Sequence, residues 1–179
     1  MKFSLKILYI LLFTITASNA TDQLYYKVGH FDYKHETGGL ALSIKNVTDK
    51  NFNIPALGQL SQIYEFYAIT DKNNFFSGEG EPARRDEYAI YASTGLQKSI
   101  NLNENFSLVP SFSVGLYQEF DQGKDMGFPI QFKSEIELNY YLSKYSFIGL
   151  TWNHISNADI GETNPGSDSI LINFKITDY

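Results

Sequence analysis

His154 and Ser156, near the C-terminus, are the pair of residues whose types and spacing best fit a chemical reaction. A β-strand points successive side chains to opposite faces, so residues two apart lie side by side on one face. An imidazole beside a hydroxyl can remove its proton and turn a serine into a nucleophile. The pair is therefore a candidate base and nucleophile for attack on an ester.

A turn and a candidate carboxylate follow this pair. Residues 157–166 are rich in Asn, Gly and Pro, the residue types that turn a chain. We expect a strand to begin near Asp168 and to run back antiparallel to the strand that ends at Ser156. Asp168 can then lie beside His154 across the hairpin. A carboxylate in that position fixes the imidazole tautomer and steadies the imidazolium, which completes a Ser-His-acid triad.

The tetrahedral intermediate of such a reaction needs hydrogen-bond donors for its oxyanion, each worth about 3 kcal/mol in comparable sites. Asn157, Asn164 and the backbone amides around Gly166 are the candidates. The sequence leaves the choice among them open.

The N-terminus has the pattern of a secretory signal peptide. Residues 1–6 are basic, residues 7–17 are mostly apolar, and Ser18-Asn19-Ala20 supplies the small residues of a cleavage site. The apolar core is too short for a confident transmembrane helix. We expect cleavage after Ala20, which leaves residues 21–179 as a single domain of 179 − 20 = 159 residues.

The charge and the cysteine count narrow the classes of partner. Two lysines leave with the signal peptide, so 14 bases and 20 acids become 12 and 20, a net charge of −8. An acidic chain argues against nucleic acid as a partner. With no cysteine and three scattered histidines, we expect no disulfide, no metal and no cofactor.

Alternating apolar and polar residues predict strands along the mature chain, and the aromatic content of 16% favours strands over helices. The alternation is clearest in residues 106–116 and 130–140. Eight antiparallel strands are expected: Leu24–Tyr33, Leu40–Val47, Ile63–Thr70, Tyr88–Leu96, Phe106–Leu116, Ile130–Tyr140, Tyr145–Ser156 and Asp168–Thr177.

An all-β, eight-stranded antiparallel transmembrane barrel of the bacterial outer membrane fits this pattern. The connections after the fourth and sixth strands are short, and those after the third, fifth and seventh are long and polar. This is the asymmetry of periplasmic turns and extracellular loops. Residues 48–59 break it, because they form a long connection where a short turn is expected. A soluble barrel that binds an apolar ligand inside is the alternative.

Residue parity places the candidate triad on the outer surface. His154 and Ser156 share the parity of Trp152, and Asp168 shares that of Ile170, so all three face the membrane at the extracellular rim. Polar groups facing lipid are costly unless they are paired or near the interface, which implies a function and an outer-leaflet lipid as substrate. The opposite parity predicts a salt-bridge set in the lumen: Lys133, Glu135 and Glu137.

The same residues resemble a known family signature. The run His154 to Ala158, followed by Asn164-Pro165-Gly166 and an acid two residues on, is similar to that of the lipid A 3-O-deacylase (PagL) family, to which acyloxyacyl-hydrolase-like outer-membrane proteins are also assigned. Residues 109–117, 123–127 and 129–138 resemble further blocks of this family. The resemblance covers roughly the C-terminal half.

The resemblance implies an eight-stranded outer-membrane barrel that hydrolyses the ester-linked 3-hydroxyacyl chain at the 3-position of lipid A in lipopolysaccharide, without a metal. It implies Ser156 as nucleophile and His154 as base. The family usually has Glu where Asp168 stands, so the two strands must lie slightly closer here. Phe132 matches a family aromatic and is expected to line the acyl groove, whereas Glu135, where the family often has Gly, is expected to face the lumen.

Two further alternatives remain open from the sequence. A catalytically silent outer-membrane barrel would use its long loops in a structural or surface-binding role. A homodimer would form through the lipid-facing aromatic side chains.

Overall fold

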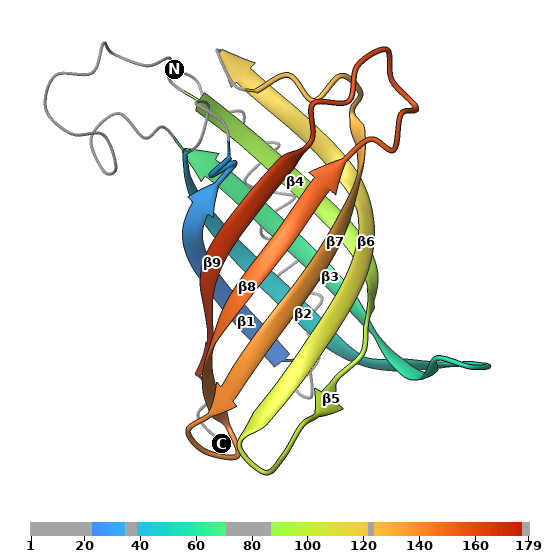
Figure 1. Ribbon diagram of the computed structural model, residues 1–179, viewed down its shortest axis with the longest axis vertical. Coiled ribbons are helices and arrows are strands. Elements are labelled where there is room, and N and C mark those ends of the chain that lie inside the picture. Colours follow the sequence, from blue (N-terminus) through green and yellow to red (C-terminus); the bar gives the residue numbers. More distant parts are fainter. Residues whose placement is uncertain (1–22, 35–38, 71–86, 122–123, 177–179) are drawn as a thin grey trace, which may run out of the picture.

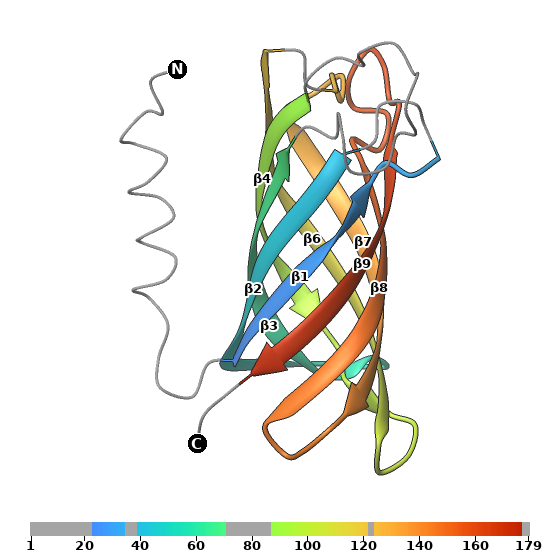
Figure 2. The ribbon, with the colours of Figure 1, turned by 90° about the vertical axis from the view of Figure 1, so that its left-hand side faces the viewer.

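The computed structural model describes residues 23–34, 39–70, 87–121 and 124–176, which form one antiparallel sheet closed into a barrel (Figures 1 and 2). The expected signal peptide, residues 1–20, and the C-terminal Tyr179 lie outside these ranges. Within the described ranges, no helix is long and apolar enough to cross a membrane.

Eight long strands form the barrel, and the eight-stranded fold predicted from the sequence is confirmed. Their order is β4-β3-β2-β1-β9-β8-β7-β6, and β4 pairs with β6 to close the sheet. A short strand, β5, pairs with the start of β6. The strands of the described chain are β1 (Gln23–Phe31), β2 (Gly39–Ile54), β3 (Gly58–Thr70), β4 (Glu87–Gln97), β5 (Ile100–Asn101), β6 (Phe106–Asp121), β7 (Ile130–Tyr141), β8 (Ser146–Ser156) and β9 (Ser167–Ile176).

The two faces of each strand follow residue parity. On β7, Lys133 and Glu135 are buried in the lumen, whereas Ile136 and Leu138 are exposed on the outer wall. A barrel that binds an apolar ligand inside would need the reverse distribution, because its apolar side chains would line the cavity. The structure therefore excludes the soluble alternative and fits a barrel surrounded by lipid.

Three lysines and three glutamates meet at the centre of the lumen with fully buried side chains. Lys27 Nζ lies 2.6 Å from Glu135 Oε1 and 2.9 Å from Glu137 Oε1. The salt-bridge set predicted from β7 is thus confirmed, and β1, β2 and β3 contribute three members that the sequence reasoning did not identify. The six residues, called the lumen cluster below, are Lys27, Lys45, Glu65, Lys133, Glu135 and Glu137.

Apolar side chains close the lumen above and below the lumen cluster. At the end where β8 finishes, Phe31, Tyr67 and Ile155 belong to one buried group. At the opposite end, Tyr25 and Phe147 belong to another, with their rings in an edge-to-face contact at 4.8 Å. The charged centre is therefore separated from water at both ends of the barrel.

The connection between β2 and β3 differs from the expectation. Residues 48–59 do not form a long loop, because both strands continue as a paired hairpin to a three-residue turn at residues 55–57. The C-terminal ends of β3, β6 and β8, which the longer connections follow in the sequence, lie at the other end of the barrel. By the usual asymmetry of outer-membrane barrels, the hairpin end is periplasmic and the end with the long connections is extracellular.

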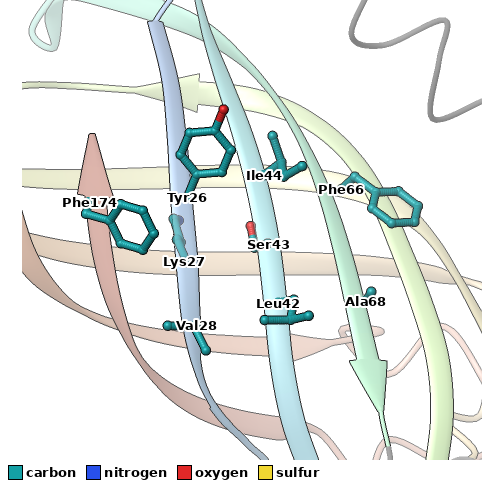
Figure 3. A pocket seen from close by; sticks show the side chains of 9 residues that line it. All are labelled: Tyr26, Lys27, Val28, Leu42, Ser43, Ile44, Phe66, Ala68 and Phe174. Carbon is teal, nitrogen blue, oxygen red and sulfur yellow. The ribbon is translucent and has the colours of Figure 1, made fainter. Parts of the chain in front are cut away.

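The outer wall carries a shallow apolar groove across β1, β2, β3 and β9 (Figure 3). Tyr26 and Phe174 stack at one side of it with ring centroids 5.7 Å apart, and Ala68 leaves space on β3. Its volume is about 300 Å³. A wall of this composition suits contact with acyl chains.

Substitution of Lys133 by Met should destabilise the barrel. The change leaves Glu65 and Glu135 buried with less compensating charge, and breaking a buried ion pair in this way costs about 3–5 kcal/mol. Urea unfolding in detergent micelles, followed by the shift in gel mobility of the unheated protein, measures the loss. The exposed Lys144→Met variant is the control and should change stability by less than about 0.5 kcal/mol. Equal stabilities would contradict the structural role of the lumen cluster.

Candidate active site

His154 and Asp168 form a pair on the outer wall at the extracellular end of the β8–β9 hairpin. They are direct cross-strand partners, and His154 Nδ1 lies 3.2 Å from Asp168 Oδ1. The imidazole is partly exposed, at 41%, whereas the carboxylate is largely covered, at 11%. A carboxylate at Nδ1 selects the tautomer that carries a proton there, which leaves Nε2 free to accept one.

Ser156 is the last residue of β8 and lies on the same outward face, two residues beyond His154. Two residues of strand separate the Cα atoms by about 6.6–6.8 Å, a gap that an imidazole and a hydroxyl can bridge by side-chain rotation. Among the described residues, no hydrogen bond joins Ser156 to His154. The candidate base and the candidate nucleophile are therefore neighbours whose contact requires that rotation.

The turn after β1 holds the carboxylate from the other side. Lys34 Nζ lies 2.8 Å from Asp168 Oδ2, and the Tyr33 amide donates a hydrogen bond to the Asp168 carbonyl at 3.0 Å. The hydrogen bond to Asp168 raises the pKa of the Lys34 ammonium above its usual value, so this cation stays charged at neutral pH. Each carboxylate oxygen of Asp168 thus has its own partner.

An apolar strip adjoins Ser156 on the outer wall. Phe132 of β7 is the direct cross-strand partner of Ser156. The Phe132 ring stacks on Phe112 of β6, with centroids 6.0 Å apart and an angle of 18° between the ring planes. Val114 pairs with Phe132 in the next step across the wall. Phe132, the predicted groove residue, therefore belongs to an apolar strip that begins directly beside Ser156.

Asn157 and Asn164, two of the oxyanion candidates, organise the loop after β8. The buried Asn157 side chain donates to the carbonyls of Met126 at 2.9 Å and Thr163 at 2.6 Å. Its backbone amide donates to Asn164 Oδ1 at 3.1 Å, and Asn164 Nδ2 donates to Asp159 Oδ1 at 3.0 Å. The Asn157 donors are thus engaged within this loop and with the connection between β6 and β7, whereas the Asn164 amide keeps a second hydrogen.

Gly166, the third candidate, lies against the imidazole. Its φ of +61° favours glycine, and a Cβ at this position would lie 3.1 Å from His154 Cε1. Its carbonyl accepts a hydrogen bond from Lys124 Nζ at 2.6 Å, and the same ammonium lies 2.6 Å from the buried Asp32 carboxylate. Within the described chain, no hydrogen bond occupies the Gly166 amide. This N–H is a donor close to the His154 ring.

Most of the chain matches one known protein family. A family model described as lipid A 3-O-deacylase (PagL) matches residues 38–177, which include all the candidate site residues. The chain belongs to this family. The match reaches well beyond the C-terminal half in which the sequence resemblance was found, and it places the barrel in the bacterial outer membrane.

Solved structures agree on the fold of this deacylase-family member. The crystal structure of the outer membrane enzyme PagL has a TM-score of 0.56 at 15% identity, covering 88% of this chain and 100% of that chain. Neisserial surface protein A (NspA) has a TM-score of 0.60 at 7% identity, covering 88% of this chain and 97% of that chain. No curated protein sequence matches this chain.

Asp168 stands where the family usually has Glu, and this difference does not break its pairing with His154. Because Asp168 and His154 are direct cross-strand partners, the shorter carboxylate still comes within hydrogen-bonding distance of the ring.

In the described residues, no cluster of three or more His, Asp and Glu side chains could hold a metal ion.

Two lysines of the site were missed by the sequence reasoning. Lys34 reaches Asp168 because β1 and β9 become neighbours when the barrel closes. Lys124, which follows β6, binds both Gly166 after β8 and Asp32 after β1, so it links three connections that are distant in the sequence. A basic residue just beyond a strand end was the signal available for Lys34, and it is too common to be specific.

Substitution of Gly166 by Ala should displace the His154 ring. The methyl group would press on Cε1, and a non-glycine residue in the left-handed region costs about 1–2 kcal/mol of backbone strain. Imidazole ¹⁵N NMR signals in detergent micelles should shift for His154, identified by their loss in His154→Gln. Glu162→Ala, an exposed change in the same loop, is the control. Unchanged His154 signals in Gly166→Ala would contradict the close approach.

Proposed function

We propose that the chain is a lipid A deacylase that hydrolyses the ester-linked 3-hydroxyacyl chain at the 3-position of lipid A in the outer leaflet. Ser156 is the nucleophile, His154 the general base and Asp168 the orienting acid. The observation that carries the proposal is the His154–Asp168 pair on the lipid-facing wall beside Ser156, at the extracellular end of a barrel that belongs to this family.

In the first half of the reaction, Ser156 Oγ attacks the ester carbonyl carbon while His154 Nε2 takes the hydroxyl proton. The tetrahedral intermediate carries its charge on the former carbonyl oxygen. As it collapses, the bond to the sugar oxygen breaks, and His154 returns the proton to that oxygen. The products are lipid A with a free 3-hydroxyl and an acyl group esterified to Ser156.

In the second half, a water molecule attacks the acyl-serine ester while His154 takes one of its protons. Collapse of this second intermediate breaks the bond to Ser156 Oγ, which regains a proton from His154. The 3-hydroxy fatty acid leaves. Asp168 stabilises the imidazolium in both halves, and its pairing with Lys34 through the other oxygen limits rotation of the carboxylate.

Donors for the oxyanion are available in the loop after β8. The Gly166 amide and the second hydrogen of the Asn164 amide are the donors that the loop does not use internally, whereas the Asn157 side chain already donates twice. We therefore favour Gly166 and Asn164 over Asn157. A preorganised donor of this kind is worth about 3 kcal/mol in the transition state.

The location of the triad supports a lipid substrate. A sugar ester at the level of the outer-leaflet headgroups can meet Ser156 from the side, while its acyl chain follows the apolar strip of Phe132 and Phe112. Export to this membrane would require a signal peptide, for which residues 1–20 have the pattern, and residues 21–179 would then be the single barrel domain. The comparisons do not support the homodimer.

Mass spectrometry of lipid A tests the proposal. Lipid A from cells expressing the wild-type protein should lose the mass of one 3-hydroxyacyl chain, because the triad cleaves that ester. Lipid A from cells expressing Ser156→Ala should keep it, with the variant still folded in the outer membrane as judged by its heat-modifiable gel mobility. Unchanged lipid A in both strains, with both proteins folded, would instead support a catalytically silent barrel with a structural or surface-binding role.

The acid provides a second test with purified protein and lipid A. Asp168→Asn should lower kcat by about 10³–10⁴-fold, because the amide favours the wrong imidazole tautomer. Asp168→Glu restores the residue that the family usually has and should retain activity. Loss of activity in both variants with normal folding would show that this carboxylate has a role other than orienting the base.

A further inference from the structure

The β2–β3 hairpin leaves the barrel at its periplasmic end. Residues 48–50 of β2 face the single residue Gln62 of β3, so the register shifts between Val47 and Asn51. Such a bulge bends a strand pair and increases its twist. Figure 1 shows the hairpin running outward beside the base of β6, and Figure 2 shows it lying across the barrel base. It therefore extends sideways rather than downward into the periplasm.

The hairpin has one apolar and one polar face. Phe52 pairs with Leu60, and these paired side chains share a face with Ile54, which is two residues along the strand. The pairs one step away form the opposite face. That face consists of Asn51, Asn53, Gln59 and Ser61.

A groove of about 580 Å³ lies between the apolar face of the hairpin and the outer wall of β4 and β6. Leu60 is 8% exposed at its base, whereas Phe52 and Leu57 are 46% and 53% exposed along the hairpin. Lys98 Nζ donates a hydrogen bond to the Leu57 carbonyl at 2.6 Å, which ties the tip to the end of β4. The lining residues from the wall include Leu96, Phe112 and Val114.

We propose that this hairpin is an interfacial membrane element, and that the groove binds acyl chains of phospholipids in the inner leaflet. At its end away from the hairpin, the groove meets the apolar strip of Phe112 and Val114 described above, so it is continuous with the lipid-facing wall. An amphipathic element in this position exposes its apolar face to acyl chains and its polar face to water. The proposal does not depend on catalysis by Ser156.

The ends of the hairpin carry charge that suits this level of the membrane. Lys50, at the bulge, is exposed beside the exposed Asp49, and Lys98, just beyond β4, reaches the tip through its hydrogen bond to Leu57. Lysine side chains at a membrane interface extend their ammonium groups to the headgroup level while their stems cover apolar surface. Phosphate groups of the inner leaflet are the matching anions.

Tryptophan fluorescence tests the orientation of the hairpin. Trp152 is the one tryptophan of the sequence, so a Trp152→Phe background allows single reporters. Phe52→Trp places the reporter on the apolar face, and the matched control Asn53→Trp places it on the polar face one residue on. Leu57→Trp at the tip is a second apolar-face reporter. Each full-length protein is reconstituted in phosphatidylethanolamine and phosphatidylglycerol vesicles, with folding checked by gel mobility.

The Phe52 and Leu57 reporters should lose as much fluorescence to chain-brominated phospholipid as the lipid-facing Trp152 does in the wild-type protein. The Asn53 reporter should instead be quenched by aqueous iodide. Iodide quenching of all three reporters would overturn the proposal in favour of a hairpin in water that binds a periplasmic protein. A third outcome is that the apolar-face reporters are protected from both quenchers, but only when the protein density in the vesicles is high. This outcome would overturn the proposal in favour of a second copy of the chain bound to the hairpin.

Discussion

The pairing of three lysines with three glutamates inside the lumen is the interaction on which the rest of the structure depends. These charges come from β1, β2, β3 and β7, so they meet only when the sheet closes. A slip of one residue in any of these strands would turn its charged side chains toward lipid, at a cost of several kcal/mol for each unpaired ion. The lumen cluster therefore sets the register, and the register decides which side chains face outward.

The site follows from that register. On β8 and β9 the outward positions include His154, Ser156 and Asp168, and the direct pairing of the two strands puts His154 opposite Asp168. Closure of the sheet then brings the turn after β1 to Asp168, and Lys34 completes the surroundings of the carboxylate. The barrel thus holds the side chains of His154, Ser156 and Asp168 close together on its outer wall. An isolated β8–β9 hairpin would leave them unconstrained.

Residue parity was enough to predict the strands, the outward positions of His154, Ser156 and Asp168, and part of the lumen cluster, because period-two alternation is a local property of the chain. It was not enough for Lys27, Lys45 and Glu65, whose partners on β7 lie between about 70 and 110 residues away, nor for Lys34. The hairpin was mistaken for a loop because Asn51, Pro55 and Gly58 have a turn's composition. The bulge before Asn51 hides the alternation, since three residues there oppose one.

The filled lumen has a consequence for the cell envelope. In the described part of the barrel, packed charges between two apolar layers leave no continuous aqueous path along the axis. A bacterium can accumulate many copies of such a protein without making its outer membrane leaky to antibiotics or ions. The barrel is then compatible with an intact permeability barrier.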